Sequence, residues 1–256
     1  MELRRPLRSL KQRAAPALLV PVTHSSPQQA LAFIKEAAAK PFIDFFELRI
    51  DCLEGALDVE TVSHFVQQAQ IAVGNKGTIV TFRTAAEGGN TDISASDYVA
   101  LYQRLLAATT PSYIDVEANR GSAVVKEVMA AARARQAGVI ISRHDFTHTP
   151  AREMLIEQLE QLHAYAADVV KLAVMPHTND DVLALLGATS AFKQRYPEQP
   201  LITMSMGPIG LLSRLAGEQF GSDATFGKLG SASAPGQIDA ETLHELLAQL
   251  HQLNAV

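Results

Sequence analysis

Short apolar runs rich in β-branched residues alternate along the chain with longer stretches whose apolar residues recur every three or four positions. The short runs predict eight strands, over residues 17–23, 42–51, 77–83, 113–119, 138–146, 168–176, 200–207 and 223–230. The longer stretches predict a helix after each strand, as in 151–167, where Leu155, Leu159 and Leu162 form one apolar face. Three dipeptides typical of helix starts are Ser26-Pro27, Thr149-Pro150 and Asn179-Asp180.

Eight strand–helix pairs favour a closed barrel. The runs Ile79-Val80 and 139–141 are continuously apolar, as expected where both faces of a parallel sheet are covered. The length of 256 residues also matches one α/β barrel of about 250 residues. The alternative is a doubly wound nucleotide-binding sheet, but no G-x-G-x-x-G follows the first strand and no P-loop occurs. We therefore predict an α/β protein with a single (β/α)₈ TIM-barrel domain over 17–256.

Composition narrows the class of protein further. A hydrophobic content of 47% allows a sizeable core, and a net charge of −5 argues against affinity for nucleic acid or an anionic membrane. No apolar run approaches the roughly 18 residues of a membrane span. The basic segment 1–16 lacks the apolar core of a secretory signal, so we predict a solvated lead-in and a cytoplasmic protein. Cys52 is the only cysteine, which excludes an intramolecular disulfide and a cysteine-based structural zinc site.

Catalytic groups in such a barrel lie at the carboxyl ends of the strands. The polar or polarizable residues predicted there are Glu47, Arg49, Arg83, Glu87, His144, Lys171, Met204, Met206, Arg214, Ser233 and Gln237. Metal binding is poorly supported, because the sequence has neither an H-x-x-x-H nor an H-E-x-x-H spacing.

Three of these residues form a candidate catalytic set. Lys171 stands among aliphatic residues, and burial there favours a neutral, nucleophilic amine that can form a Schiff base with a carbonyl. The unperturbed pKa of a histidine, about 6.5, allows His144 to serve as general acid and base. Glu87 could orient the imidazole. The alternatives are an ion-paired or snorkelling lysine, a structural histidine and a solvated loop glutamate.

The arginines indicate an anionic ligand. Arg49, Arg83 and Arg214 offer donor forks that suit a carboxylate or a phosphate, although pairing with Glu47, Asp51 or Glu87 is the simpler alternative. Glycines after the seventh and eighth strands also allow a phosphate site. Met204 and Phe226 are expected to form walls of the pocket.

Eight segments carry a family resemblance: FELRID (46–51), TFRTAAEGG (81–89), SRHDF (142–146), KLAVMP (171–176), TMSMG (203–207), SRLAGEQFGS (213–222), ATFG (224–227) and SASAPGQ (231–237). With them the chain resembles type I 3-dehydroquinate dehydratases along nearly its full length. The resemblance implies a (β/α)₈ hydro-lyase, usually a homodimer, without metal or organic cofactor. It also implies the third step of the shikimate pathway, in aromatic amino acid biosynthesis, from 3-dehydroquinate to 3-dehydroshikimate and water.

The resemblance also implies roles for single residues. Lys171 would be the Schiff-base lysine, His144 the general acid/base and Glu87 the residue that orients it. The positions implied to bind the substrate are Glu47, Arg49, Arg83, Arg214, Ser233 and Gln237, with Arg214 expected on the carboxylate. One departure is Val20-Pro21-Val22 in the first strand, where relatives often have a substrate-contacting serine, so we expect at most weak contact there.

Two other functions stay open from the residues alone. One is a class I aldolase, which would use the same kind of lysine to cleave a phosphorylated sugar. The other is a barrel without enzymatic activity, which would only bind a carboxylate. The loop 231–237 is the candidate lid over the ligand, because it is rich in small residues.

Overall fold

The computed structural model describes residues 16–230 and 233–254, so the predicted lead-in lies outside it except for Pro16. The described chain divides into two compact units. The first unit contains the residues up to Val20 and those from Arg143 onward, and the second is Pro21–Ser142. The divisions fall within strands β1 and β5, and each unit is described by itself. The extent of a single domain over 17–256 stays a prediction.

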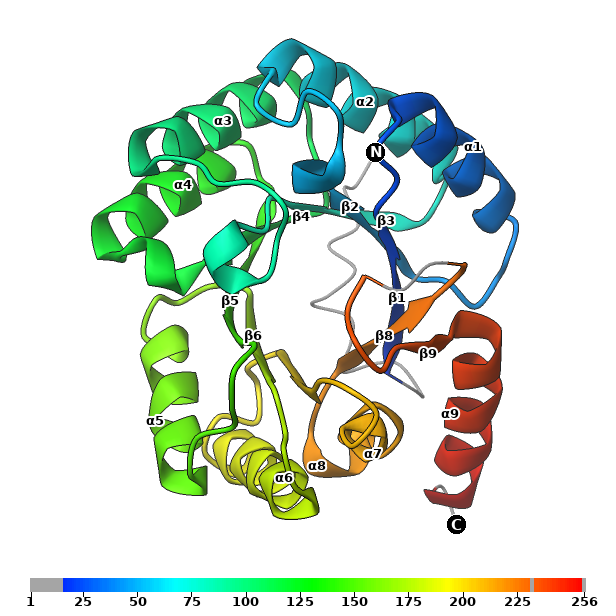
Figure 1. Cartoon of the computed structure of the whole chain (residues 1–256), viewed down its shortest axis with the longest axis vertical. Coiled ribbons are helices and arrows are strands. Elements are labelled where there is room, and N and C mark those ends of the chain that lie inside the picture. The colour runs from blue at the N-terminus through cyan, green and yellow to red at the C-terminus, as the bar shows by residue number, and fades with distance from the viewer. Residues whose placement is uncertain (1–15, 231–232, 255–256) are drawn as a thin grey trace. The chain divides into compact units, whose positions relative to one another are not determined.

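Strands and helices alternate along the chain as the pattern predicts (Figure 1). The strands are β1 (Ala17–Val22), β2 (Phe45–Arg49), β3 (Gly77–Thr81), β4 (Tyr113–Glu117), β5 (Gly138–Asp145), β6 (Val169–Val174), β7 (Leu201–Ser205), β8 (Ala224–Lys228) and β9 (Ile238–Asp239). The α-helices are α1 (Pro27–Ala37), α2 (Val59–Ala72), α3 (Ala95–Ala108), α4 (Ser122–Ala134), α5 (Arg152–His163), α6 (Asn179–Arg195), α7 (Leu211–Leu215), α8 (Gly217–Phe220) and α9 (Ala240–Asn254). Short 3₁₀ helices are η2 (Ile50–Cys52), η3 (Ala85–Glu87) and η4 (Ala118–Arg120).

In the second unit, β2, β3, β4 and β5 pair in parallel in that order. Every residue of β2, β3 and β4 is buried, which explains their continuous apolarity. Helices α3 and α4 lie side by side outside β4 (Figure 1). Gly77 begins β3 directly under the Phe45 ring, where an added Cβ would lie 2.1 Å from a ring carbon. Close contact of the two strands therefore requires glycine at this position.

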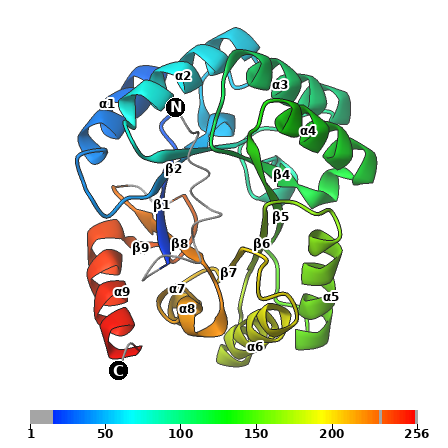
Figure 2. The same cartoon turned by 180° about the vertical axis from the view of Figure 1, so that it is seen from behind.

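In the first unit, β6 pairs in parallel with β7, and β8 pairs in parallel with β1 and β9. The start of β7 is bonded to the residue before β8, because Asp223 N–H donates to the Leu201 carbonyl at 2.7 Å. Helices α5 and α6 pack against each other outside β6, and α9 packs against β8, as seen from behind in Figure 2. Within the described residues, no helix is both long and apolar enough to cross a bilayer.

The local differences from the predicted elements have physical causes. The predicted second strand begins too early: residues 42–44 precede β2, and Lys76 Nζ donates to the Ile43 carbonyl at 2.7 Å there. The prediction of a helix start at Thr149-Pro150 is wrong, because α5 begins at Arg152. The Thr149 hydroxyl instead donates to the Met175 carbonyl at 2.9 Å. Helix α6 begins at the predicted Asn179, although its cap is Thr178, which forms a capping box with Asp181.

Candidate active site

Lys171 lies in the middle of β6, a strand in which every residue is buried. Its side chain is only 4% exposed, and its Nζ lies 4.8 Å from the centroid of the Phe226 ring of β8. The structure thus brings together the predicted Schiff-base lysine and one predicted wall residue. The alternative in which the lysine side chain reaches solvent is wrong.

His144 lies near the carboxyl end of β5, and its ring stacks on Phe146 with 6.4 Å between centroids. The next residue, Asp145, organises the loop that follows. Its Oδ1 accepts from the Thr147 hydroxyl at 2.6 Å and from the backbone N–H groups of Thr147 and His148 at 2.8 and 3.0 Å. Burial works to raise the pKa of Asp145, but these hydrogen bonds outweigh it and lower the pKa below its ordinary value. The ionised carboxylate therefore fixes the turn directly after His144.

Arg214, on α7, is a buried guanidinium without a carboxylate partner among the described residues. It is 1% exposed, its Nη2 donates to the Pro235 carbonyl at 3.3 Å, and its Nη1 lies 3.9 Å from Met204 Sδ. Its Nε is buried without an acceptor in the described chain. Burial alone lowers the pKa of Arg214 to about 10. A buried cation with spare donors is suited to bind an anion.

The segment 233–237 lies beside this guanidinium. Gln237 Oε1 accepts from the Ser233 N–H at 2.9 Å, and Gln237 Nε2 donates to Ser233 Oγ at 2.9 Å. Gly207 N–H donates to the Pro235 carbonyl at 3.0 Å, which fixes the segment against the end of β7. The predicted binding residues Arg214, Ser233 and Gln237 are thus gathered in one place. Ser231 and Ala232 of the predicted lid lie outside the described residues, so the lid stays a prediction.

In the second unit, Arg83 is the cation of a buried ionic cluster. Its Nη2 donates to Asp115 at 2.7 Å, and its Nη1 donates to Glu117 at 2.9 Å and lies 3.4 Å from Glu87. Burial alone would lower the pKa of Arg83, but the charges of Asp115, Glu117, Glu87 and Glu47 raise it well above its ordinary value. Ion pairing, left open from the sequence, is present here. The carboxylates it engages include two, Asp115 and Glu117, that the sequence analysis did not name.

Glu87 is 1% exposed, so the alternative of a solvated loop glutamate is wrong. It ends η3, and Gly88 then takes a left-handed conformation with φ of 83°. The backbone returns so closely over Arg83 that a Cβ on Gly89 would lie 1.8 Å from the Arg83 carbonyl oxygen. These two glycines allow a glutamate four residues after Arg83 to turn back into the cluster.

Arg49 and Asp51 form a second buried pair. Arg49 Nε and Nη2 donate to the two Asp51 oxygens at 2.8 and 2.7 Å, and Asp51 Oδ1 also accepts from the Arg83 N–H at 3.0 Å. On the same strand as Arg49, Glu47 accepts from the Thr81 hydroxyl at 3.1 Å. Burial, and to a lesser extent the Asp51 charge, raises the pKa of the neighbouring Cys52 thiol to about 11. The thiol therefore stays protonated at neutral pH.

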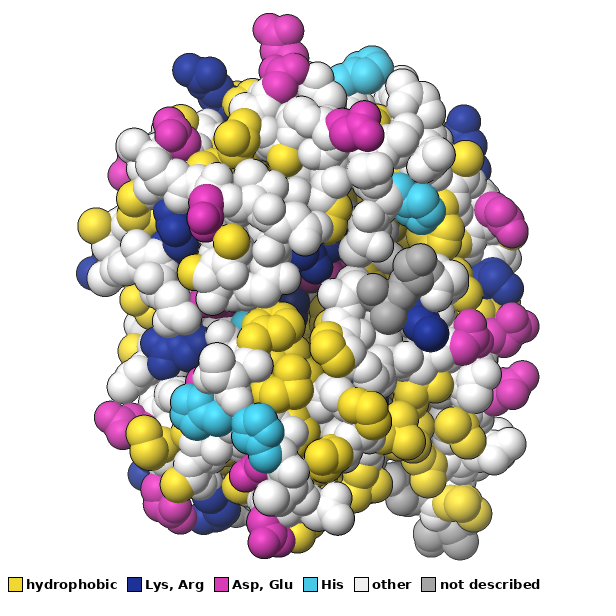
Figure 3. Space-filling model, in the orientation of Figure 1, with side chains coloured by type: hydrophobic (Ala, Val, Ile, Leu, Met, Phe, Trp, Pro, Cys, Tyr) yellow, Lys and Arg dark blue, Asp and Glu magenta, His cyan; other side chains and the backbone are white. Residues whose placement is uncertain are grey.

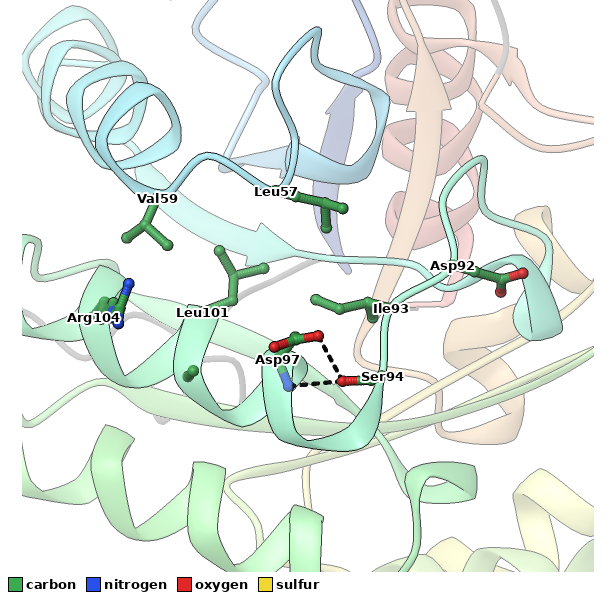
Figure 4. Close-up of a pocket in the computed structure, with 9 residues that line it drawn as sticks. Leu57, Val59, Asp92, Ile93, Ser94, Asp97, Leu101 and Arg104 are labelled. Carbon is green, nitrogen blue, oxygen red and sulfur yellow. Dashed lines mark hydrogen bonds between the residues drawn. The ribbon is translucent and has the colours of Figure 1, made fainter.

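A surface pocket of about 330 Å³ lies elsewhere in the second unit, between the start of α2 and α3 (Figure 4). Leu57, Ile93 and Leu101 line its apolar part, and the Ser94 hydroxyl there caps α3 by accepting from the Asp97 N–H at 3.1 Å. The predicted site residues do not line it. Among the described residues, no cluster of three or more histidine, cysteine or acidic side chains is arranged to hold a metal ion.

Comparison with known proteins decides the family. The family model of type I 3-dehydroquinase matches residues 18–254. The chain belongs to the type I 3-dehydroquinase family. It is 42% identical to the 3-dehydroquinate dehydratase of Lactiplantibacillus plantarum over 236 residues, which is 92% of each chain. It is also 42% identical to the enzyme of Escherichia coli O157:H7 over 209 residues, or 82% of this chain and 83% of that one.

Solved structures of 3-dehydroquinate dehydratases support the same family. The type I enzyme of Clostridium difficile, with covalently modified comenic acid, has a TM-score of 0.90 at 35% identity and covers 94% of each chain. The 3-dehydroquinate dehydratase of Enterococcus faecalis has a TM-score of 0.86 at 31% identity, and the match covers 93% of this chain and 95% of that one. The predicted (β/α)₈ fold class, the family and the enzyme class, a hydro-lyase, are thereby confirmed. The roles of single residues stay predictions.

The acids of β4 are the site residues that sequence analysis missed. Asp115 and Glu117 are both 0% exposed and hold Arg83. The signal was available in the sequence YIDVE (113–117), because acids two residues apart in a strand point to the same face. Two charges on one face of an otherwise apolar strand indicate a buried ionic site.

Proposed function

We propose that this protein converts 3-dehydroquinate to 3-dehydroshikimate and water, the third step of the shikimate pathway, through a Schiff base on Lys171. Membership of the 3-dehydroquinase family supports the substrate. The observation that carries the proposal is the chemistry gathered in the first unit. A buried amine lies over an aromatic ring, and a buried guanidinium lacks an anion within the described chain. A ketone that bears a carboxylate offers one group to each.

The elimination needs an electron sink next to the acidic proton. The Lys171 amine adds to the ketone, and loss of water gives an iminium ion. His144 removes the proton from the adjacent carbon, and the electrons of that C–H bond form an enamine. The enamine expels the hydroxyl group, which leaves as water with the proton from His144. A second water hydrolyses the remaining imine and frees Lys171, so the net reaction releases one water.

The other residues hold the ring in one orientation. Arg214 binds the substrate carboxylate with the N–H donors that have no acceptor within the described residues. Ser233 and Gln237 bind the substrate next to Arg214. Met204, against the guanidinium, and Phe226, under the amine, wall the pocket. Glu47, Arg49 and Arg83 bind substrate oxygens, and Glu87 holds the His144 imidazole. Because proton and hydroxyl must face one imidazole in turn, this positioning contributes directly to the rate.

Assembly and location complete the proposal. We expect a homodimer in the cytoplasm, in keeping with the family resemblance. Several large apolar side chains of the first unit are exposed, among them Ile209, Leu211 and Leu212 at 43%, 43% and 51%. Figure 3 shows several hydrophobic side chains at the surface of one face. Exposed apolar groups of this kind favour burial against a second copy. Light scattering on the purified protein tests the dimer, and a monomer at micromolar concentration would contradict it.

A steady-state assay tests the function. The protein should form 3-dehydroshikimate from 3-dehydroquinate and should not cleave phosphorylated sugars, which would be the activity of a class I aldolase. Lys171→Ala and His144→Ala should nearly abolish turnover and leave the fold intact by circular dichroism. Lys193→Ala is the matched control. This lysine forms an ion pair with Asp223, at 2.7 Å, and has no part in the proposed chemistry. Substantial turnover by Lys171→Ala would refute the mechanism.

A further inference from the structure

Ser142 is a buried hydroxyl on the strand that carries His144. It lies two residues before His144 in β5, is 0% exposed and points to the same face of the strand as His144. Its Oγ donates to Asp115 Oδ1 at 2.6 Å and accepts from Arg83 Nη1 at 3.2 Å. The hydroxyl therefore donates to Asp115 and accepts from Arg83, and these two side chains form an ion pair with each other at 2.7 Å.

The position of Ser142 in the sheet gives these bonds their importance. The parallel register of β4 and β5 runs from Tyr113–Gly138 to the pair Glu117–Ser142 and ends there. His144 lies two residues beyond this last pair, where β4 no longer fixes the course of β5. A short hydrogen bond to a buried carboxylate is among the stronger and more directional side-chain bonds. It is formed at the last residue of β5 that pairs with β4, directly before β5 extends beyond that ladder.

The carboxylate that holds Ser142 is itself rigidly placed. Asp115 is 0% exposed and bonded to Arg83, and Arg83 is held in turn by Glu117 and Glu87. Glu117 also accepts from the Thr84 N–H at 2.8 Å and from its hydroxyl at 2.7 Å. Each member thus has charged or polar partners that restrict its rotamer. Because the members of this network are held in place by one another, they also hold the Ser142 hydroxyl in one position.

We propose that Ser142 is a positioning residue of the reaction, which anchors the end of β5 to the Arg83–Asp115 pair so that the His144 imidazole is held where the proton is transferred. The proposal rests on the proposed function. It deepens that function by adding a residue that does not touch the substrate. Loss of the hydroxyl should slow proton transfer and leave substrate binding nearly unchanged, since Arg83 keeps its bonds to Asp115 and Glu117 and the substrate carboxylate is assigned to Arg214.

The test is Ser142→Ala, assayed with 3-dehydroquinate well below the Tm of each variant. We expect kcat to fall about 10- to 100-fold, because small displacements of a catalytic group cost rates of that order. KM should stay within about threefold of wild type. The kinetic isotope effect for substrate deuterated next to the ketone should increase, as proton removal becomes more rate-limiting. Ser142→Thr, which keeps the hydroxyl, should recover most of kcat.

Ser205→Ala is the matched control. Ser205 is also a fully buried serine at the carboxyl end of a strand, but its Oγ has no hydrogen-bond partner within the described chain. This variant removes the same atom from a similar environment and should keep kcat within about twofold. If Ser142→Ala keeps the wild-type kcat and isotope effect, the positioning role is refuted, even where its Tm falls. An inactive wild type would instead refute the proposed function.

Discussion

Replacing Arg214 by methionine should make the ligand-free protein more stable and the enzyme much weaker. The guanidinium is 1% exposed and lacks an anionic partner in the described part of the chain. Its pKa falls to about 10 through burial, and with about 1.4 kcal/mol for each pKa unit the charged form is disfavoured by about 3 kcal/mol. Methionine retains much of the apolar volume and removes that penalty.

The net gain is smaller than this electrostatic cost. The bond from Arg214 Nη2 to the Pro235 carbonyl is lost, which costs about 1.5–3 kcal/mol because the donor is charged. We therefore expect stabilisation by about 0.5–2 kcal/mol, or roughly 1–8 °C in Tm. The sign follows from linkage: a base whose pKa is lower in the folded state destabilises the fold at pH values below that pKa. The gain should thus be present at pH 7 and fade as the pH rises through about 10.

Catalysis should change in the opposite direction. The variant loses the cation proposed for the substrate carboxylate, so kcat/KM should fall at least about 100-fold, as for truncation of one partner of a buried charge pair. Thermal unfolding without ligand and steady-state kinetics measure the two effects. Arg49→Met is the control: it leaves Asp51 buried without its bidentate partner and should destabilise the fold by about 3–5 kcal/mol. If Arg214→Met destabilises the ligand-free protein by more than about 1 kcal/mol, the reasoning is wrong.

Three further predictions concern single groups. Because the pKa of Cys52 is raised to about 11, a thiol reagent at pH 8 should label it about 100-fold more slowly in the native than in the denatured protein; equal rates would contradict this. Asp145 has a lowered pKa, so its stabilisation is present above about pH 4 and lost as the pH falls; Asp145→Asn should flatten this part of the stability–pH curve. Gly89→Ala should lower the free energy of unfolding by more than about 2 kcal/mol, because its Cβ meets the Arg83 carbonyl. An unchanged Tm would refute that clash.

The fold could be predicted because its strands are buried on both faces and are therefore apolar without interruption, as in Ile79-Val80. The predicted strand bounds were wrong where apolar residues lie outside the backbone pairing of the strand. Phe42 and Ile43 are apolar but precede the first backbone pair of β2, which is Phe45 with Gly77. Strand β9 has only two residues, too few for a periodic pattern.

The site was predictable only in part. Burial of Lys171 followed from its aliphatic neighbours along one strand, which is local information. The lack of a carboxylate near Arg214 within the described residues is a property of tertiary packing, and no spacing in the sequence encodes it. The pairing of Arg83 with Asp115 joins residues 32 positions apart, one just after the end of β3 and the other on β4. It could be expected only once the strand order and register were known.

The central claim is that the Lys171 amine bonds covalently to the substrate. Incubation with 3-dehydroquinate and borohydride, followed by mass spectrometry of the digested protein, tests it most directly. The account predicts a reduced adduct on the peptide that contains Lys171, and no adduct in Lys171→Ala. An active enzyme that gives no adduct under these conditions, or an adduct on a different lysine, would contradict it.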